Sequence, residues 1–161
     1  MADKNIGKRV GKYTLLQHLG SGSFGDVYKA TSSEDSTYYA VKIMAKSKLN
    51  TKFLVDLLHT EVSIMQEIND DHVIHLNDFM ESGSSYYLAM QLCNNGDVRQ
   101  YIDKCGKSHL HEEEATFILR QIALGFKALH KINVMHRDFK TDNLFMNDNN
   151  VVIADLGTHF F

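Results

Sequence analysis

Three glycines with the spacing G-x-G-x-x-G (Gly20, Gly22 and Gly25) lie between two strand-like segments. Glycine permits positive φ and lets backbone N–H groups approach a phosphate closely. In a dinucleotide-binding fold a helix would follow such a loop, with an acidic residue about 20 residues further on. Here a second strand-like segment, Asp26–Ala30, follows, and Ala45 stands at the acidic position. The sequence therefore predicts a glycine-rich hairpin between strands and argues against the dinucleotide-binding fold.

Apolar patterns divide the chain into a strand-rich first half and a helical second half. Strands are expected at 13–16, 26–30, 38–43, 73–80 and 86–92, with one helix at about 52–68. Beyond residue 96 we expect helices at about 97–103 and 112–130 and short strand-like pieces at 134–136, 143–146 and 151–154. Residues 1–12 are polar and basic, which predicts a loose N-terminal arm. The pattern favours an α+β fold whose small lobe has a five-stranded antiparallel sheet and one helix.

Composition narrows the class of protein. The 161 residues suffice for about one domain, and 43% hydrophobic with 23% charged residues is typical of a globular chain. A net charge of -3 is too mild for a nucleic-acid binder. No apolar run approaches the ~20 residues of a membrane-spanning helix, and the N-terminus has no secretory pattern. Two cysteines, Cys93 and Cys105, indicate a reduced, cytoplasmic protein.

Lys42 lies within the apolar strand-like segment Tyr38–Ile43. A lysine ammonium there needs an anionic partner, because burying an unpaired charge is unfavourable. Glu61, on the apolar face of the helix at 52–68, is the expected counter-ion; the alternative is an exposed helix charge. A Lys42–Glu61 pair would leave the ammonium directed at phosphate oxygens.

The segment His136–Asn143 carries the residues best suited to catalysis. Asp138 can accept a proton from an attacking hydroxyl, and Lys140 can neutralise charge on a transferred phosphoryl group. Asn143 and Asp155 supply hard oxygen ligands suited to Mg²⁺, and Gly157 permits a sharp turn after Asp155. His136 is interpreted as a packing residue that bonds to the backbone, not as a general base.

Taken together, these ordered motifs resemble the eukaryotic protein kinase family over about residues 13–157. Lys140, two residues after Asp138, matches the Ser/Thr-directed members, and the segment Tyr87–Val98 is similar to the autophagy-initiating unc-51-like kinases. The resemblance implies a bilobal kinase-like fold. It also implies transfer of the γ-phosphoryl group of ATP, with Mg²⁺, to a Ser or Thr hydroxyl of a protein substrate. A regulatory protein partner is a further expectation.

The resemblance also implies a nucleotide site. Asp138, Lys140, Asn143 and Lys42 would be catalytic, and Asn143 and Asp155 would bind the metal. Met90 would be the gatekeeper, Asp97 would reach the ribose, and the backbone of Gln91 and Cys93 would bond to the adenine edge. The full set of expected nucleotide-binding residues is Leu19, Gly20, Ser21, Gly22, Ser23, Phe24, Gly25, Val27, Ala40, Lys42, Glu61, Met90, Gln91, Cys93, Asp97 and Phe145.

The expected boundaries are an arm at 1–12 and a kinase domain at 13–161, with an N-lobe at 13–90, a hinge at 91–96 and a partial C-lobe at 97–161. The family's activation segment and later helices do not follow Gly157 in this sequence, so a C-terminally truncated catalytic lobe is expected. The apolar face of the helix at 112–130 would then be exposed. Leu156 replaces the usual Phe and Thr141 the usual Pro, but neither departure removes a catalytic group.

Two other functions stay open on the sequence. A catalytically inactive kinase fragment would bind a nucleotide or a partner chain through the intact small lobe. A small-molecule phosphotransferase of related fold is disfavoured by the His-Arg-Asp-x-Lys pattern at 136–140. Histidines at 72, 75, 109 and 111 lack the Cys or carboxylate clusters of a metal site and are interpreted as solvated turn residues.

Overall fold

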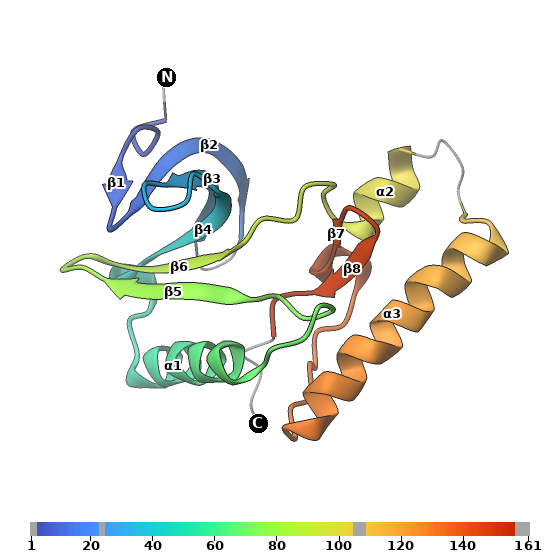
Figure 1. Ribbon diagram of the computed structural model, residues 1–161. Coiled ribbons are helices and arrows are strands. Elements are labelled where there is room, and N and C mark those ends of the chain that lie inside the picture. The colour runs from blue at the N-terminus through green and yellow to red at the C-terminus, as the bar shows by residue number, and fades with distance from the viewer. Residues whose placement is uncertain (1–2, 23–24, 105–108, 157–161) are drawn as a thin grey trace. The chain divides into compact units, whose positions relative to one another are not determined.

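The computed structural model describes residues 3–22, 25–104 and 109–156. It divides into two compact units, the first comprising 1–59 and 76–92 and the second comprising 60–75 and 93–161. Helix α1 (Lys52–Glu67) crosses the boundary, so its two halves belong to different units. Each unit has its own sheet, shown in Figure 1. The α+β class is confirmed.

The first unit is built around an antiparallel sheet of six strands in the order β1-β2-β3-β4-β6-β5. The hairpins β2–β3 and β3–β4 are consecutive in sequence, while β6 inserts between β4 and β5. A short 3-10 helix, η1 (Lys46–Lys48), leads from β4 toward α1. The strands are β1 (Arg9–Val10), β2 (Tyr13–Ser21), β3 (Gly25–Ser32), β4 (Tyr38–Ala45), β5 (Leu76–Glu81) and β6 (Ser85–Gln91).

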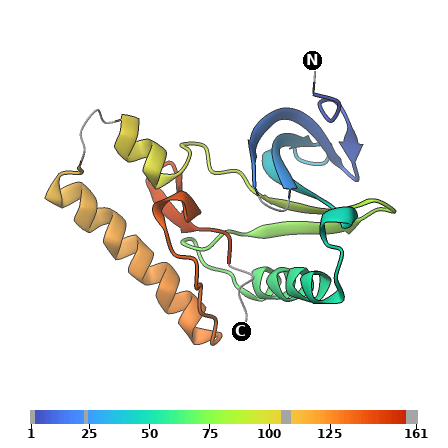
Figure 2. The ribbon, with the colours of Figure 1, turned by 180° about the vertical axis from the view of Figure 1, so that it is seen from behind.

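The sixth strand corrects the expected five-stranded sheet, because residues 1–12 are not a loose arm where the structure describes them. Arg9–Val10 forms β1 and pairs with β2. The backbone N–H of Gly7 donates to the Leu15 carbonyl at 2.8 Å, and that of Leu15 donates to the Lys8 carbonyl at 3.0 Å. These bonds satisfy backbone groups of β2 that would otherwise lie at a sheet edge. Figure 2 shows this end of the sheet from behind.

One face of this sheet forms an apolar core. Cross-strand pairs such as Tyr28 with Val41, and Val41 with Ala89, place successive residues on the same side. The tyrosine rings contribute large apolar areas to this core, and Tyr13 is fully buried within it. The buried members of the cluster are Val10, Tyr13, Leu15, Tyr28, Ala30, Val41, Tyr87 and Ala89.

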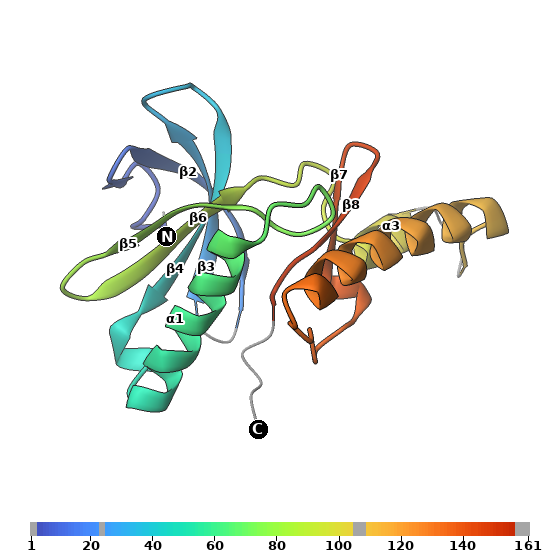
Figure 3. The same cartoon turned by 60° about the horizontal axis from the view of Figure 1, so that its bottom comes forward.

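The second unit combines helices with a two-stranded hairpin. Its further elements are α2 (Val98–Lys104), α3 (Glu112–Lys131), the 3-10 turn η2 (Thr141–Asn143), β7 (Leu144–Asn147) and β8 (Asn150–Ile153). Strand β8 lies along α3 (Figure 3). A Cβ on Gly125 would lie 2.7 Å from the His72 carbonyl oxygen, so only glycine fits where α3 approaches this backbone. The His111 N–H donates to the Glu114 carboxylate at 3.2 Å, which caps the start of α3.

The apolar face of α3 is not left exposed as the sequence predicts. Ile118, Ile122 and Leu129 are buried in the same unit as β8, whose residues 151–153 are fully buried. The exposed large apolar residues of this helix are instead Phe117, Leu119 and Leu124. Leu119 belongs to the face expected from the sequence and is 62% exposed, so the buried face is rotated slightly from the expected one.

A second correction concerns residues 134–136, which form no strand. His136 is 1% exposed and bonds to the Ala154 carbonyl through its ring, whereas Met135 beside it is 73% exposed, so this stretch is a loop held by one buried side chain. No helix among the described residues is long and apolar enough to cross a membrane.

Candidate functional site

The glycine-rich hairpin joins β2 directly to β3, as the sequence predicts. Gly20 pairs with Val27 and Ser21 with Asp26, and the Gly22 N–H donates to the Gly25 carbonyl at 2.8 Å. The bond between Gly22 and Gly25 is the last one described in this hairpin. Ser23 and Phe24, also expected to bind the nucleotide, lie outside the described residues.

Gly25 is the glycine that packing requires at this hairpin. A Cβ at this position would lie 1.9 Å from the Ile43 carbonyl oxygen on β4. No side chain fits there, because real Cβ contacts stay beyond 3.0 Å. By contrast, a Cβ on Gly20 would meet no atom within 4 Å. Gly20 and Gly22 thus have room for a side chain in the described part of the fold, and Gly25 has none.

Four of the expected nucleotide-binding residues share the sheet face opposite the tyrosine-rich core. Val27 pairs with Lys42, and Ala40 pairs with Met90. Ala40 and Lys42 are two residues apart on β4 and so point to the same side. All four are half-buried, and Leu19 is 45% exposed at the end of β2. The strand register therefore gathers these residues on one face, as binding of a flat apolar ring would require.

Lys42 and Glu61 belong to different units of the chain, Lys42 to the first and Glu61 to the second. Glu61 is 7% exposed on α1, whereas Lys42 is half-buried on β4. Burial of the Glu61 carboxylate argues against the exposed helix charge considered above, since a buried carboxylate needs compensation. The pairing of these two side chains stays a prediction.

Two of the residues expected to be catalytic, Lys140 and Asn143, contact a third, Asp138. The Lys140 Nζ lies 2.8 Å from Asp138 Oδ2. The Asn143 Nδ2 donates to the backbone carbonyl of Asp138 at 2.8 Å and to its Oδ2 at 3.1 Å. One carboxylate oxygen is therefore shared by an ammonium and an amide, which fixes the orientation of the carboxylate before any substrate binds.

The charge state of Lys140 follows from this geometry. The hydrogen bond to Asp138 raises the pKa of the Lys140 ammonium above its ordinary value of 10.5. Lys140 is exposed, and the side chain of Asp138 is 39% exposed. Lys140 is thus charged at neutral pH, and both side chains are open to a substrate.

His136 connects this segment to the end of β8. Its Nε2 lies 3.0 Å from the Ala154 carbonyl oxygen, and since a carbonyl only accepts, Nε2 carries the proton. The Nδ1 is buried and has no hydrogen-bond partner among the described residues. The Ala154 N–H in turn donates to the Asn143 carbonyl at 2.9 Å. His136 is therefore a packing and backbone-bonding residue, as interpreted from the sequence.

Two backbone positions in left-handed conformations shape the same region. Arg137 has φ +63° and Asp155 has φ +57°. Such conformations are uncommon for residues with a Cβ and are concentrated at functional sites. The left-handed conformation of Asp155 turns the chain sharply after β8. The next residue, Leu156, is buried, with 3% of its surface exposed. Gly157, expected to permit this turn, lies outside the described residues.

Asn143 and Asp155 flank the open end of the β7–β8 hairpin, beyond the last pair, Leu144 with Ile153. Asn143 uses its Nδ2 to bond Asp138, which leaves its amide oxygen as the atom suited to a metal. Asp155 is exposed. An amide oxygen and a carboxylate are hard oxygen ligands of the kind Mg²⁺ prefers, so these residues fit the expected metal.

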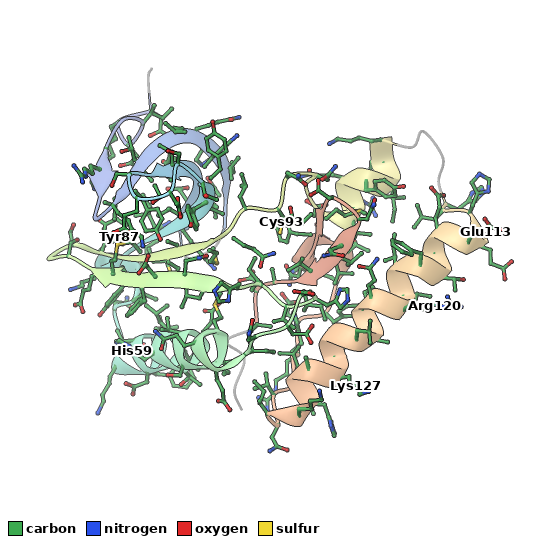
Figure 4. The ribbon with its side chains drawn as sticks, in the orientation of Figure 1. His59, Tyr87, Cys93, Glu113, Arg120 and Lys127 are labelled. Carbon is green, nitrogen blue, oxygen red and sulfur yellow. The ribbon has the colours of Figure 1, made fainter. Side chains whose placement is uncertain are left out.

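The segment after β6 lies against β7. Cys93, a half-buried cysteine that is labelled in Figure 4, lies near its start. Asp97 forms an isolated bridge with Phe145. The Asp97 Oδ1 accepts a 2.7 Å hydrogen bond from the Gln100 N–H and so caps α2. This cap, which sequence reasoning missed, leaves the other carboxylate oxygen for the expected ribose contact.

Sequence reasoning also missed Gln121. It is 7% exposed on α3, its Nε2 donates to the Asn149 carbonyl at 3.1 Å, and its Oε1 accepts from the Val151 N–H at 2.8 Å. Both ends of one amide thus hold the hairpin that carries Asn143 and Asp155. The available signal was a polar residue on the apolar side of an amphipathic helix, beside Ile118 and Ile122.

Comparison with known proteins decides the family. A family profile described as "Protein kinase domain" matches residues 13–159. The chain belongs to the protein kinase family. Within this kinase chain, the matched range includes the glycine-rich hairpin, Lys42 and the whole segment around Asp138.

Several curated kinases are similar to this chain over most of its length. Serine/threonine-protein kinase 33 of Mus musculus is 36% identical over 155 residues, covering 90% of this chain and 31% of that protein. Serine/threonine-protein kinase ATG1c of Arabidopsis thaliana is 35% identical, covering 94% of this chain and 21% of that protein. Serine/threonine-protein kinase PLK4 of Drosophila grimshawi is 34% identical, covering 96% of this chain and 20% of that protein.

These relatives confirm the expected Ser/Thr-type resemblance. ATG1c is the relative that matches the similarity to unc-51-like kinases noted in the sequence. The kinase chain spans about a third or less of the length of these curated relatives.

Proposed function

We propose that this chain transfers the γ-phosphoryl group of ATP to a Ser or Thr hydroxyl of a protein substrate. The observation that carries the proposal is the Asp138 carboxylate, held at one oxygen by Lys140 and Asn143. Lys140 two residues after Asp138, together with the Ser/Thr kinase relatives, supports Ser or Thr as the acceptor. We place the reaction in the cytoplasm, where the Cys93 thiol stays reduced.

Asp138 would orient the acceptor hydroxyl and take its proton as the oxygen attacks. The bonds from Lys140 and Asn143 to Oδ2 hold the carboxylate in one orientation for this role. Lys140 keeps its charge at neutral pH and would neutralise negative charge that develops on the transferred group. Prior orientation of these groups reduces the reorganisation needed at the moment of transfer.

Asn143 and Asp155 would hold Mg²⁺ through their oxygen atoms. When bound, the metal neutralises phosphate charge and orients the phosphates for in-line attack. The chain's own contribution is to fix the two ligands at the open end of one hairpin.

The remaining residues would bind the nucleotide. The glycine-rich hairpin, from Gly20 to Gly25, would bring backbone N–H groups to the phosphates, and Lys42 with Glu61 would hold the phosphates. Val27, Ala40 and Leu19 would contact the adenine on one side and Phe145 on the other. Met90 would line the end of the adenine pocket, and Asp97 would bond to the ribose. The backbone of Gln91 and Cys93 would bond to the adenine edge.

The test compares Asp138→Asn with Asp142→Asn as a matched control. Both changes remove one carboxylate from the same loop, and Asp142 is exposed with its Oδ2 3.4 Å from the Thr141 hydroxyl. Transfer from radiolabelled ATP to Ser, Thr and Tyr peptide pools is measured with Mg²⁺. Asp138→Asn should slow transfer by roughly 10²–10⁴-fold, with MgATP affinity unchanged, while Asp142→Asn should transfer normally.

Undiminished transfer by Asp138→Asn would refute the role of Asp138. Binding of MgATP by the wild-type chain with no transfer to any pool would favour the non-catalytic nucleotide-binding alternative. Transfer confined to the Tyr pool would refute the Ser/Thr assignment.

A further inference from the structure

The segment between β6 and α2 pairs with β7 like a short additional strand. The Asn95 N–H donates to the Met146 carbonyl at 3.0 Å, and the Met146 N–H donates to the Gly96 carbonyl at 2.8 Å. Asp97 then stands opposite Phe145. Two backbone hydrogen bonds are few for setting a register, and a slip by one residue would turn every side chain to the opposite face.

Hydrogen bonds from side chains further define the register of this segment. The Asn94 Nδ2 donates to Asp148 Oδ1 at 2.8 Å, and the Asp148 N–H donates back to Asn94 Oδ1 at 3.0 Å. The same N–H also lies 3.1 Å from Asn95 Oδ1. We call the reciprocal pair of bonds between Asn94 and Asp148 the Asn94–Asp148 clamp.

The clamp closes on a turn whose backbone is itself unusual. Asp148 begins the two-residue connection between β7 and β8 and has φ +52°. Asp and Asn tolerate this conformation better than other residues with a Cβ. Gln121 holds the same turn from α3 through the Asn149 carbonyl. The turn is therefore a fixed point of the second unit, to which the segment starting at Asn94 is fastened.

We propose that Asn94 is a positioning residue for nucleotide recognition and acts through Asp97. The clamp fixes the register that places Asp97 opposite Phe145. This inference rests on the proposed function, in which those two residues contact the ribose and the adenine. Asn94 itself contacts neither. Loss of the clamp would let Asp97 shift from the ribose hydroxyls while the phosphate-binding residues stay in place.

The clamp can be broken and restored by exchanging its polar groups. Asn94→Asp sets two carboxylates against each other where an amide met a carboxylate, so the clamp should open. Asp148→Asn keeps an acceptor oxygen and the backbone donor in place, because the new amide oxygen can still accept from Asn94 and asparagine tolerates φ +52°. In the double variant Asn94→Asp/Asp148→Asn the direction of the amide–carboxylate bond is reversed and the clamp reforms. Asn94→Ala removes the clamp without repulsion.

The readout is the ratio of the Kd for 2′,3′-dideoxy-ATP to the Kd for ATP, each with Mg²⁺. A hydrogen bond from the ribose to the Asp97 carboxylate should give wild type a ratio of roughly ten. We expect wild type, Asp148→Asn and the double variant to keep this ratio, and Asn94→Asp and Asn94→Ala to bring it to about one to three. General loosening of the fold would weaken both nucleotides equally and leave the ratio unchanged.

Each outcome separates the hypotheses. If wild type binds no MgATP, the proposed function fails, and this inference fails with it. If wild type shows the ratio and both Asn94 variants keep it, the inference alone is overturned. Failure of the double variant to recover, with its thermal unfolding midpoint unchanged, would also overturn it. If Asn94→Asp does not fold, the ratio of the two Kd values for Asn94→Ala decides whether the inference holds.

Discussion

The glycine-rich hairpin and the segment around Asp138 are held in place in different ways. In the hairpin, positions follow from strand register: Gly20 opposite Val27, and Gly25 against the backbone of β4. Around Asp138 there is no continuous strand, and positions follow from hydrogen bonds between side chains and backbone, such as that of His136 to Ala154. The comparison teaches that added side-chain volume should destabilise the first region, whereas loss of polar groups should destabilise the second.

The largest expected effect is from Gly25→Ala. The new Cβ would lie 1.9 Å from the Ile43 carbonyl oxygen, so β3 and β4 must separate. We expect the free energy of unfolding to fall by about 3 kcal/mol, measured by urea denaturation. Gly20→Ala is the matched control, since its Cβ meets no atom within 4 Å. Equal stability of the two variants would contradict the claim that backbone contact defines this hairpin.

His136→Ala tests the polar side of the comparison. The ring is 1% exposed, lies 6.3 Å from the rings of Phe126 and Phe139, and makes the bond to Ala154. Its removal should lower the free energy of unfolding by about 2 kcal/mol, from lost packing and an orphaned carbonyl. His130→Ala, which changes an exposed histidine on α3, should stay within about 0.5 kcal/mol. If His136→Ala left the free energy of unfolding unchanged, the segment would be held by other contacts.

Tyr13→Phe, in the first unit, should lower the free energy of unfolding by less than His136→Ala does. The Tyr13 hydroxyl donates to the Asp78 carboxylate, which Lys12 also contacts at 3.2 Å. Asp78 therefore keeps one partner, and we expect a loss of about 1 kcal/mol at neutral pH. Tyr38→Phe, at an exposed tyrosine, serves as the control. A loss for Tyr13→Phe no larger than for Tyr38→Phe would show that the Asp78 bond adds nothing.

The same residue predicts a dependence on pH. Burial, and then the bond to Asp78, raise the pKa of Tyr13 above its ordinary value of 10.0, so the folded state holds the phenol proton more tightly. The resulting stabilisation is complete below pH 10 and is lost as the pH rises through the folded value. Tyr13→Phe should therefore make the decline of stability above pH 10 shallower, as followed by denaturation between pH 8 and 11. An unchanged slope would contradict the assignment.

The smallest expected effect concerns Lys140 and pH. Because Asp138 raises the pKa of Lys140 above 10.5, the ammonium stays charged throughout the range from pH 6 to 9. The pH–rate profile of wild type should thus show no inflection from Lys140 in that range, and Lys140→Arg should leave the profile's shape unchanged. An inflection above pH 8 that disappears in Lys140→Arg would contradict this expectation.

Most of the first unit could be predicted from the sequence, because strand patterns and the position of Gly25 are local signals. The β1 strand could not: Arg9–Val10 is too short for a periodic signal, although Val10 joins the apolar core beside β2. The exposed face of α3 was misjudged, since periodicity shows that a helix has an apolar side but not which neighbour covers it.

The candidate site was predicted residue by residue through motifs, while its supporting bonds were not. The roles of Asp138, Lys140 and Asn143 were predicted, but the bonds from Lys140 and Asn143 to Asp138 were not. The contributions of Gln121 and of the Asn94–Asp148 clamp depend on contacts between segments 30 and 54 residues apart in sequence. Gln121 is marked only by being polar on the apolar side of a helix, and Asn94 and Asp148 are exposed and carry no local pattern.

The most direct test of the account is calorimetric titration of ATP into the wild-type chain, Lys42→Met and Asp155→Asn, with and without Mg²⁺. The account predicts that wild type binds ATP more tightly with Mg²⁺, that Lys42→Met binds weakly in both conditions, and that Asp155→Asn loses the benefit of Mg²⁺. Binding of ATP that responds neither to Mg²⁺ nor to either substitution would contradict it.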